Sequence, residues 1–126
     1  MIDLATYKLL HLIGVFFIVM SFGALIFRSC SRAEAGWFSK RKLSVIHGLG
    51  MLISGVAGFG MLARLGLGSA AWPDWVWIKF FIWLTLGFLI AAVNRVPSKS
   101  VLWWWFILVL AATAAYIGLN HRAIGS

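Results

Sequence analysis

Polar residues divide this chain into four long apolar stretches. Each stretch is about 20 residues long, which at the helical rise of 1.5 Å per residue crosses the ~30 Å hydrocarbon core of a bilayer. The four stretches are Leu9–Phe27, Leu43–Ala63, Trp75–Val93 and Val101–Leu119. Backbone amides in lipid must be hydrogen-bonded within their own segment, so all four stretches are predicted to be helices. Short connections favour an all-α protein, an antiparallel bundle of four transmembrane helices over about 6–28, 43–65, 75–95 and 100–120, in one domain of residues 1–126.

The composition fits a membrane protein and leaves no room for a soluble domain. The chain has 126 residues, of which 63% are hydrophobic and 11% are charged. Nearly all of its charged residues lie outside the apolar stretches, whereas a soluble bundle needs them along one face of each helix. Cys30 is the only cysteine, which excludes an internal disulfide. A cleaved signal peptide is not expected, because the first stretch is longer than the apolar core of such a peptide.

The net charge of +8 is divided unevenly between the two sets of helix ends. Seven cations lie at the ends joined by the 28–42 and 94–100 loops: Arg28, Arg32, Lys40, Arg41, Lys42, Arg95 and Lys99. Four lie at the other ends: Lys8, Arg64, Lys79 and Arg122. Excess Lys and Arg mark the cytoplasmic side, so we expect a multi-pass protein of the cell inner (plasma) membrane, with both termini outside and the 28–42 loop cytoplasmic. The basic loops then face anionic lipid of the bilayer, and nucleic-acid binding is not expected.

Two of the apolar stretches carry ionisable residues on a face that also holds small or aromatic residues. Tyr7, His11 and Gly14 recur at spacings of three and four, so they share a stripe that faces the bundle. Lys79 and Trp83 lie one turn apart on the third stretch. An ionisable group inside a bilayer is costly, which makes His11 and Lys79 candidate functional residues.

The direction of each helix predicts which of these side chains meet. His11 and Lys79 each lie about one turn inside the outer boundary, and His121 ends the fourth stretch at the same face. His47 lies near the cytoplasmic boundary, about 15 Å from His11 in depth at helical rise. We therefore expect the first three side chains to be neighbours, and we expect that His11 and His47 cannot bind one iron.

Each of these residues also has a purely structural explanation. Lys79 can extend to the outer headgroups, His11 can hydrogen-bond a neighbouring helix, His121 can be solvated, and His47 can belong to a helix start. The chain has no HExxH, Walker or GxSxG motif, and its three acids lie at the water boundary. No paired carboxylates and no polar series suited to a pore are present.

Small residues line one face of the second stretch. Gly50, Ser54 and Gly58 recur at a spacing of four, which allows two helices to approach closely. We expect them to form the closest helix–helix contact of the bundle. The same residues leave room for a flat cofactor, so packing alone and packing beside a cofactor both remain open.

Segments of the first and third stretches carry a family resemblance. They are Lys8–His11, Ser21–Ala24 followed by Arg28, and Trp75–Lys79. In this order they resemble small four-span haem-associated membrane proteins, a group that includes the bacterial four-helix protoporphyrinogen oxidase and its copper-resistance and SirB-like relatives. A Trp and a Pro of that family's first span, and a Tyr-His pair of its third span, are absent here.

The resemblance implies that His11 and Lys79 are the essential pair and that haem b is associated with them. The first hypothesis is accordingly a b-type haem membrane protein that acts in electron transfer or porphyrin oxidation. His11 is the expected axial ligand of the haem iron, because imidazole is a common haem ligand and bundle cores are where such ligands are built. Lys79 is expected as the second ligand or as a propionate partner, and His121 as the alternative second ligand.

Three further residues complete the expected haem site. Tyr7 is expected to hydrogen-bond a propionate, Trp83 to stack on the porphyrin, and Gly14 to leave an open slot beside the histidine. Two hypotheses of other classes remain open. One is a non-catalytic accessory subunit of a larger membrane complex or a homo-oligomer, and the other is a small transporter.

Overall fold

Four long helices make up almost all of the structure, a computed structural model that describes residues 2–31, 38–68, 70 and 72–121. They are α1 (Leu4–Ser31), α2 (Lys40–Arg64), α3 (Asp74–Arg95) and α4 (Ser100–Asn120), with the short 3-10 helix η2 (Pro97–Lys99) before α4. Each long helix is apolar and long enough to cross a membrane. The predicted all-α bundle of four transmembrane helices is confirmed, and the protein is a small multi-pass membrane protein.

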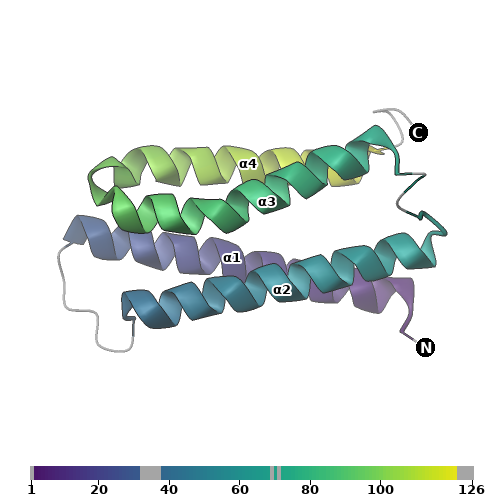
Figure 1. The fold of residues 1–126 in the computed structure, drawn as a ribbon, viewed down its shortest axis with the longest axis horizontal. Coiled ribbons are helices and arrows are strands. Elements are labelled where there is room, and N and C mark those ends of the chain that lie inside the picture. Colours follow the sequence, from purple (N-terminus) through teal and green to yellow (C-terminus); the bar gives the residue numbers. More distant parts are fainter. Residues whose placement is uncertain (1, 32–37, 69, 71, 122–126) are drawn as a thin grey trace.

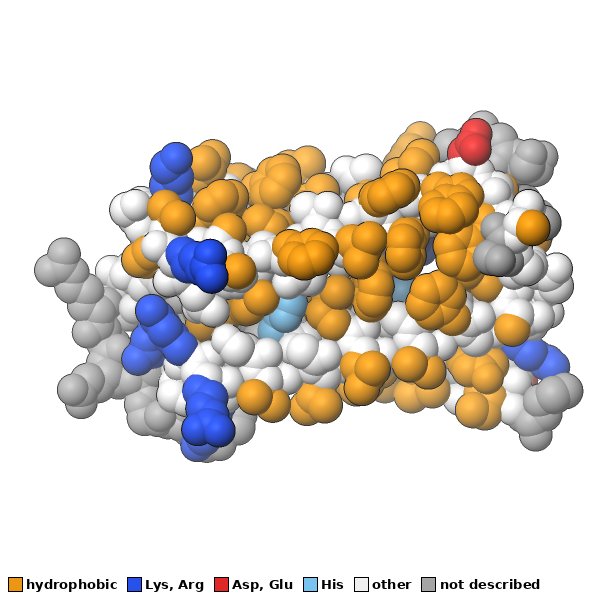
Figure 2. Space-filling model, in the orientation of Figure 1, with side chains coloured by type: hydrophobic (Ala, Val, Ile, Leu, Met, Phe, Trp, Pro, Cys, Tyr) orange, Lys and Arg blue, Asp and Glu red, His pale blue; other side chains and the backbone are white. Residues whose placement is uncertain are grey.

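The helices run antiparallel, so the bundle has two distinct ends (Figure 1). At one end α1 begins and α4 ends, and we call this the terminal end. At the other end α1 and α3 end while α2 and α4 begin, and we call this the basic end. Lys and Arg side chains gather at the basic end, at the left of the view (Figure 2).

Local signals in the sequence start and stop the helices. The Asp3 carboxylate accepts a hydrogen bond from the backbone N–H of Thr6 at 2.7 Å, which caps the start of α1. Ser39 caps α2 by accepting from the Lys42 N–H at 3.3 Å. Gly66 follows α2 with a φ of +73°, a conformation that favours glycine, and lets the chain turn away.

The closest pair of helices is α1 and α2. A Cβ placed on Gly14 would lie against Ser54 N and 2.8 Å from both Gly50 O and Ser54 Cα. A Cβ placed on Gly50 would lie 2.7 Å from Gly14 O. The close contact expected at Gly50 and Ser54 is therefore confirmed, with Gly14 as their partner. Gly58 differs from the expectation, because a Cβ placed there would be at an ordinary 3.5 Å from His11 Nδ1.

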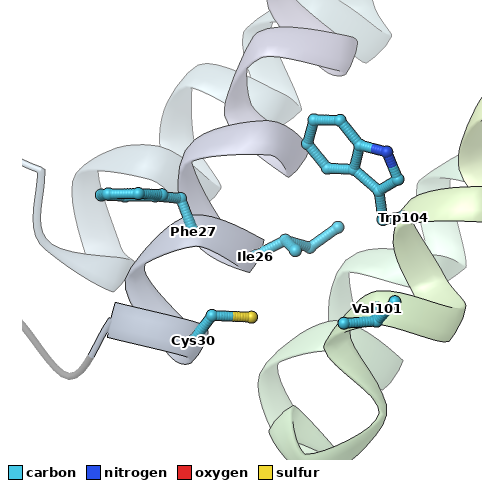
Figure 3. A pocket seen from close by; sticks show the side chains of 5 residues that line it. All are labelled: Ile26, Phe27, Cys30, Val101 and Trp104. Atoms are coloured by element: carbon cyan, nitrogen blue, oxygen red, sulfur yellow. The ribbon is translucent and has the colours of Figure 1, made fainter.

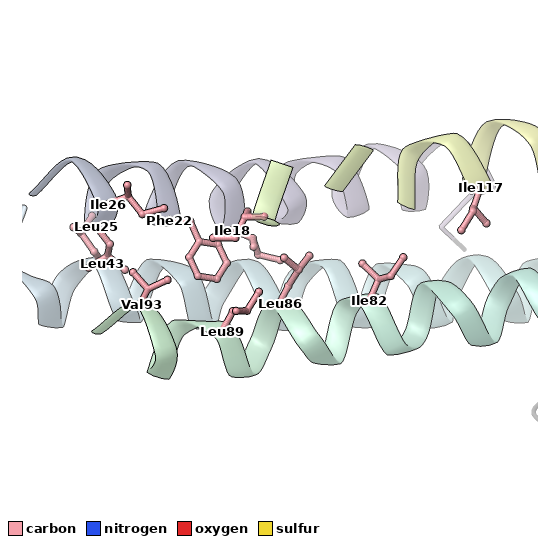
Figure 4. Packing of buried hydrophobic residues seen from close by; sticks show 11 residues of the cluster. Ile18, Phe22, Leu25, Ile26, Leu43, Ile82, Leu86, Leu89, Val93 and Ile117 are labelled. Atoms are coloured by element: carbon pink, nitrogen blue, oxygen red, sulfur yellow. The ribbon is translucent and has the colours of Figure 1, made fainter. Parts of the chain in front are cut away.

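Most large buried apolar side chains lie toward the basic end (Figure 4). The buried cluster consists of Ile18, Phe22, Leu25, Ile26, Leu43, Ile82, Leu86, Leu89, Val93, Ile107 and Ile117. In α4 only Ser100, Ile107 and Ile117 are buried. The half of the bundle near the terminal end is therefore held by fewer large side chains, and it is there that His11 and Lys79 lie.

Candidate functional site

The polar residues of the terminal half start with His11 on α1. Its Nδ1 lies 2.8 Å from the backbone carbonyl oxygen of Ser54 on α2. A carbonyl oxygen can only accept, so Nδ1 is the protonated nitrogen and donates, and Nε2 keeps a free lone pair in the neutral ring. Gly58, one turn beyond Ser54, faces the same ring, and a Cβ placed there would be 3.5 Å from His11 Nδ1, an ordinary contact. The expected hydrogen bond to a neighbouring helix is present, and it leaves one imidazole nitrogen available.

Ser54 connects this histidine to α3. The residue is fully buried, and its hydroxyl donates to Met51 O at 3.1 Å. The indole N–H of Trp83 is 3.1 Å from Ser54 Oγ and 3.3 Å from Met51 O. The Trp83 ring lies on Gly55, where a Cβ would be 2.7 Å from Cζ2. Trp83 therefore joins α3 to α2, a role that the sequence analysis missed.

Lys79 occupies the same half of the bundle. Its Nζ lies 3.1 Å from the position that a Cβ on Gly118 of α4 would take. The ammonium is close enough to His11 to interact with it electrostatically. Lys79 is half-buried, and it forms no ion pair with the residues that the structure describes. A cation in this position can receive an anionic group of a ligand.

His121 completes the cluster at the end of α4. Its Nδ1 lies 3.0 Å from Gly118 O, which again leaves Nε2 as the free nitrogen. The ring packs on Trp75 with centroids 4.7 Å apart. Gly118 thus has Lys79 on one side and His121 one turn away. The structure brings His11, Lys79 and His121 to one half of the bundle, as expected from helix direction.

His47 lies elsewhere, toward the basic end. Its Nε2 is 3.1 Å from Leu86 O, and its ring meets Phe22 edge-on with centroids 4.7 Å apart. The residue is 3% exposed, so packed side chains surround it. Along α2 it lies seven residues from Ser54, about 10 Å at helical rise. His47 and His11 are therefore at different depths, as expected.

Two expected site residues have different surroundings from those foreseen. The slot expected beside His11 at Gly14 is filled by the backbone of α2, so nothing flat can enter there. The ring of Tyr7 lies directly on Gly60 of α2. Figure 2 shows histidine atoms along the seam between α2 and α3, among apolar side chains. Any ligand of His11 must therefore approach from the side of α3 and α4.

No group of three or more His, Cys, Asp or Glu able to hold a bare metal ion occurs among residues 2–31, 38–68, 70 and 72–121. The candidate site thus offers one or two imidazoles and a lysine. No family model, curated protein or solved structure matches this chain.

Proposed function

We propose that this membrane protein binds a b-type haem in the terminal half of its bundle, with His11 as an axial ligand of the iron, and that it acts in electron transfer or porphyrin oxidation. The observation that carries the proposal is the hydrogen bond from His11 Nδ1 to Ser54 O at 2.8 Å. Histidines that bind metal nearly always donate their other ring N–H to a carbonyl or carboxylate, which orients the ring and strengthens the ligand. His11 has this arrangement.

The other histidines support the choice by contrast. His47 makes a similar hydrogen bond to Leu86 O, but it is surrounded by core side chains that leave no space for a macrocycle. His121 has a free Nε2 but lies at the end of α4, nearer to water than His11. Only His11 combines a fixed ring, a free nitrogen and a position inside the span. The resemblance of Lys8–His11 and Trp75–Lys79 to haem-associated four-span proteins favours the same residue.

The residues present fit a haem in their chemistry. The Lys79 ammonium can pair with a propionate, and this assignment is favoured over iron ligation because the side chain extends toward Gly118 on α4. The Tyr7 hydroxyl, which makes no hydrogen bond to a described residue, can donate to the second propionate. His121 is the alternative second ligand. A bound haem would supply one-electron exchange between ferric and ferrous iron.

We infer that the terminal end faces the outside of the inner membrane and the basic end faces the cytoplasm. Arg28, Lys40–Lys42, Arg95 and Lys99 all lie at the basic end, whereas Lys8, Arg64 and Lys79 are the described cations near the terminal end. This asymmetry follows the positive-inside rule. The proposed haem would then lie near the outer leaflet, within reach of an electron partner on that side.

A second function, that of an accessory subunit in a larger membrane complex, is favoured by α4. This helix buries only three of its residues, and its exposed side chains include Leu119 at 84% and Val101 at 64%. Such a surface fits lipid or a neighbouring subunit equally well. The accessory role predicts a protein that carries no haem and purifies with other membrane chains.

The proposal is tested by comparing haem content in three proteins expressed with excess haem. Wild type should show a Soret band, His11→Ala should lose at least about 90% of it, and His47→Ala should keep it. Circular dichroism and gel filtration establish that each variant still inserts and folds. A normal Soret band in folded His11→Ala would refute the assignment of the ligand, and a loss confined to His47→Ala would move the site to the basic half.

A further inference from the structure

A lateral groove separates α1 from α4 at the basic end. It has a volume of about 230 Å³ and is lined by Ile26, Phe27, Cys30, Val101 and Trp104 (Figure 3). Every one of these side chains is apolar or weakly polar. The groove is distinct from the His11 site, which lies in the opposite half of the bundle.

The groove lies at the ends of two membrane-spanning helices, the level at which hydrocarbon is expected to meet headgroups. Cys30 is one residue before the end of α1, and Val101 is one residue after the start of α4. Trp104 forms one wall, and indole rings favour this level of a bilayer. The groove therefore offers apolar walls to the first carbons of a lipid tail, directly beside the headgroup layer.

Cations lie at the same end of the bundle as the groove. Lys99 immediately precedes α4 and Arg95 ends α3, and both are exposed. Two of the three acids of the chain, Asp3 and Asp74, lie at the other end of the bundle, and Glu34 falls outside the described residues. At the same end the Arg28 Nε is buried with no hydrogen-bond partner among the described residues. This end of the bundle is therefore complementary to an anion.

We propose that this groove binds one anionic phospholipid, with an acyl chain between α1 and α4 and the phosphate beside Lys99 and Arg95. The apolar lining selects the chain, and the cations select an anionic headgroup over a zwitterionic one. A volume of about 230 Å³ suits part of an acyl chain, whereas a helix with its side chains is about 10–12 Å across. The lipid would fill the space that the limited contact between α1 and α4 leaves.

Cys30 provides a reporter for this site, because it is the only cysteine and its side chain is exposed at the groove. The full-length protein in a mild detergent is treated with a maleimide, and the alkylation rate is measured as phosphatidylglycerol is added. We expect saturable protection, with a rate at least about fivefold lower at saturation. The same amounts of phosphatidylcholine should change the rate by less than about twofold.

Matched variants separate a bound lipid from a general effect of detergent. Val101→Trp fills the groove and should abolish the lipid dependence, whereas Val109→Trp, at an exposed position of the same helix, should behave like wild type. Lys99→Glu should weaken protection at least about fivefold, and Lys8→Glu at the terminal end should not. Equal protection by both lipids, unchanged protection in Val101→Trp, or protection that appears only when two copies associate would overturn the proposal.

Discussion

Replacing Gly14 with alanine tests the packing on which the whole terminal half depends. The new Cβ would meet backbone atoms of α2 only, namely Ser54 N, Ser54 Cα and Gly50 O. Backbone atoms cannot rotate away as a side chain can. The helices α1 and α2 must therefore move apart at the level of His11.

The cost follows from the distances. Two of the contacts would lie at 2.8 Å, whereas the optimum between carbon atoms is about 3.5–4.0 Å, so the helices must separate by about 1 Å. The 2.8 Å hydrogen bond from His11 to Ser54 O would then exceed hydrogen-bonding range. Overpacking costs about 1–3 kcal/mol, and an interhelical hydrogen bond in a membrane contributes about 0.6 kcal/mol. We expect Gly14→Ala to lower the free energy of unfolding by about 2–3 kcal/mol.

The matched control is Gly48→Ala on α2, where a Cβ would have no neighbour within 4 Å. Unfolding of each variant in mixed micelles by increasing denaturing detergent, followed by circular dichroism, gives the difference in free energy. Gly50→Ala should resemble Gly14→Ala, and the double variant should cost little more than either single one, because the same separation accommodates both methyl groups. Equal stability of Gly14→Ala and Gly48→Ala would refute the close contact of α1 with α2.

Three further predictions concern α3, the start of α1 and the topology. Gly55→Ala should displace the Trp83 ring, because Cζ2 would lie 2.7 Å from the new Cβ. The free energy of unfolding in detergent should fall by about 1 kcal/mol. A stability equal to that of Gly48→Ala would contradict the contact. Hydrogen bonds from the side chain and backbone of Thr6 hold the pKa of Asp3 below its ordinary value of 3.8. The Asp3 carboxylate therefore stabilises the start of α1 fully above pH 3.8, and this stabilisation is lost as the pH falls through the lowered pKa of the folded protein. The protection of the Thr6 amide against exchange, measured relative to its intrinsic exchange rate at each pH, should therefore fall at low pH in wild type but not in Asp3→Ala. A reporter that is active only in the cytoplasm should be inactive when fused to the C-terminus. An active reporter would show that the C-terminus is cytoplasmic, opposite to the proposed orientation.

The positions of the helices could be predicted from the sequence because the thickness of the bilayer sets the length of each apolar stretch. The observed helices begin and end within about three residues of the expected bounds, as usual for such boundaries. The separation of His11 from His47 followed from helical rise alone. Which residues share one end of the bundle is thus determined by depth, and depth can be read directly from the sequence.

The rotation of each helix about its axis was harder to predict. Gly14 was expected to leave a slot, but it is the point of closest contact with α2. The hydrogen bonds from the Trp83 indole N–H to Met51 O and Ser54 Oγ on α2 were not foreseen. Periodicity shows which residues share a face, but it does not show which helix that face meets.

One signal in the sequence does point to these interhelical hydrogen bonds. Ser54 accepts from His11 and is followed four residues later by Gly58, over which the ring lies. Met51 accepts from Trp83 and is followed four residues later by Gly55, over which the indole lies. In a helix, the residue four positions on covers the carbonyl, so a glycine there exposes the oxygen to a donor from another helix.

The most direct test of the central claim is the haem content of the unmodified protein. Wild type should be purified in mild detergent from membranes grown with excess haem, and its absorption spectrum and pyridine haemochrome should be measured. We expect a Soret band and about one b-type haem per chain, with reduced bands that disappear when His11 is replaced by alanine. A protein that is folded, monodisperse and free of haem under these conditions would contradict the proposed function.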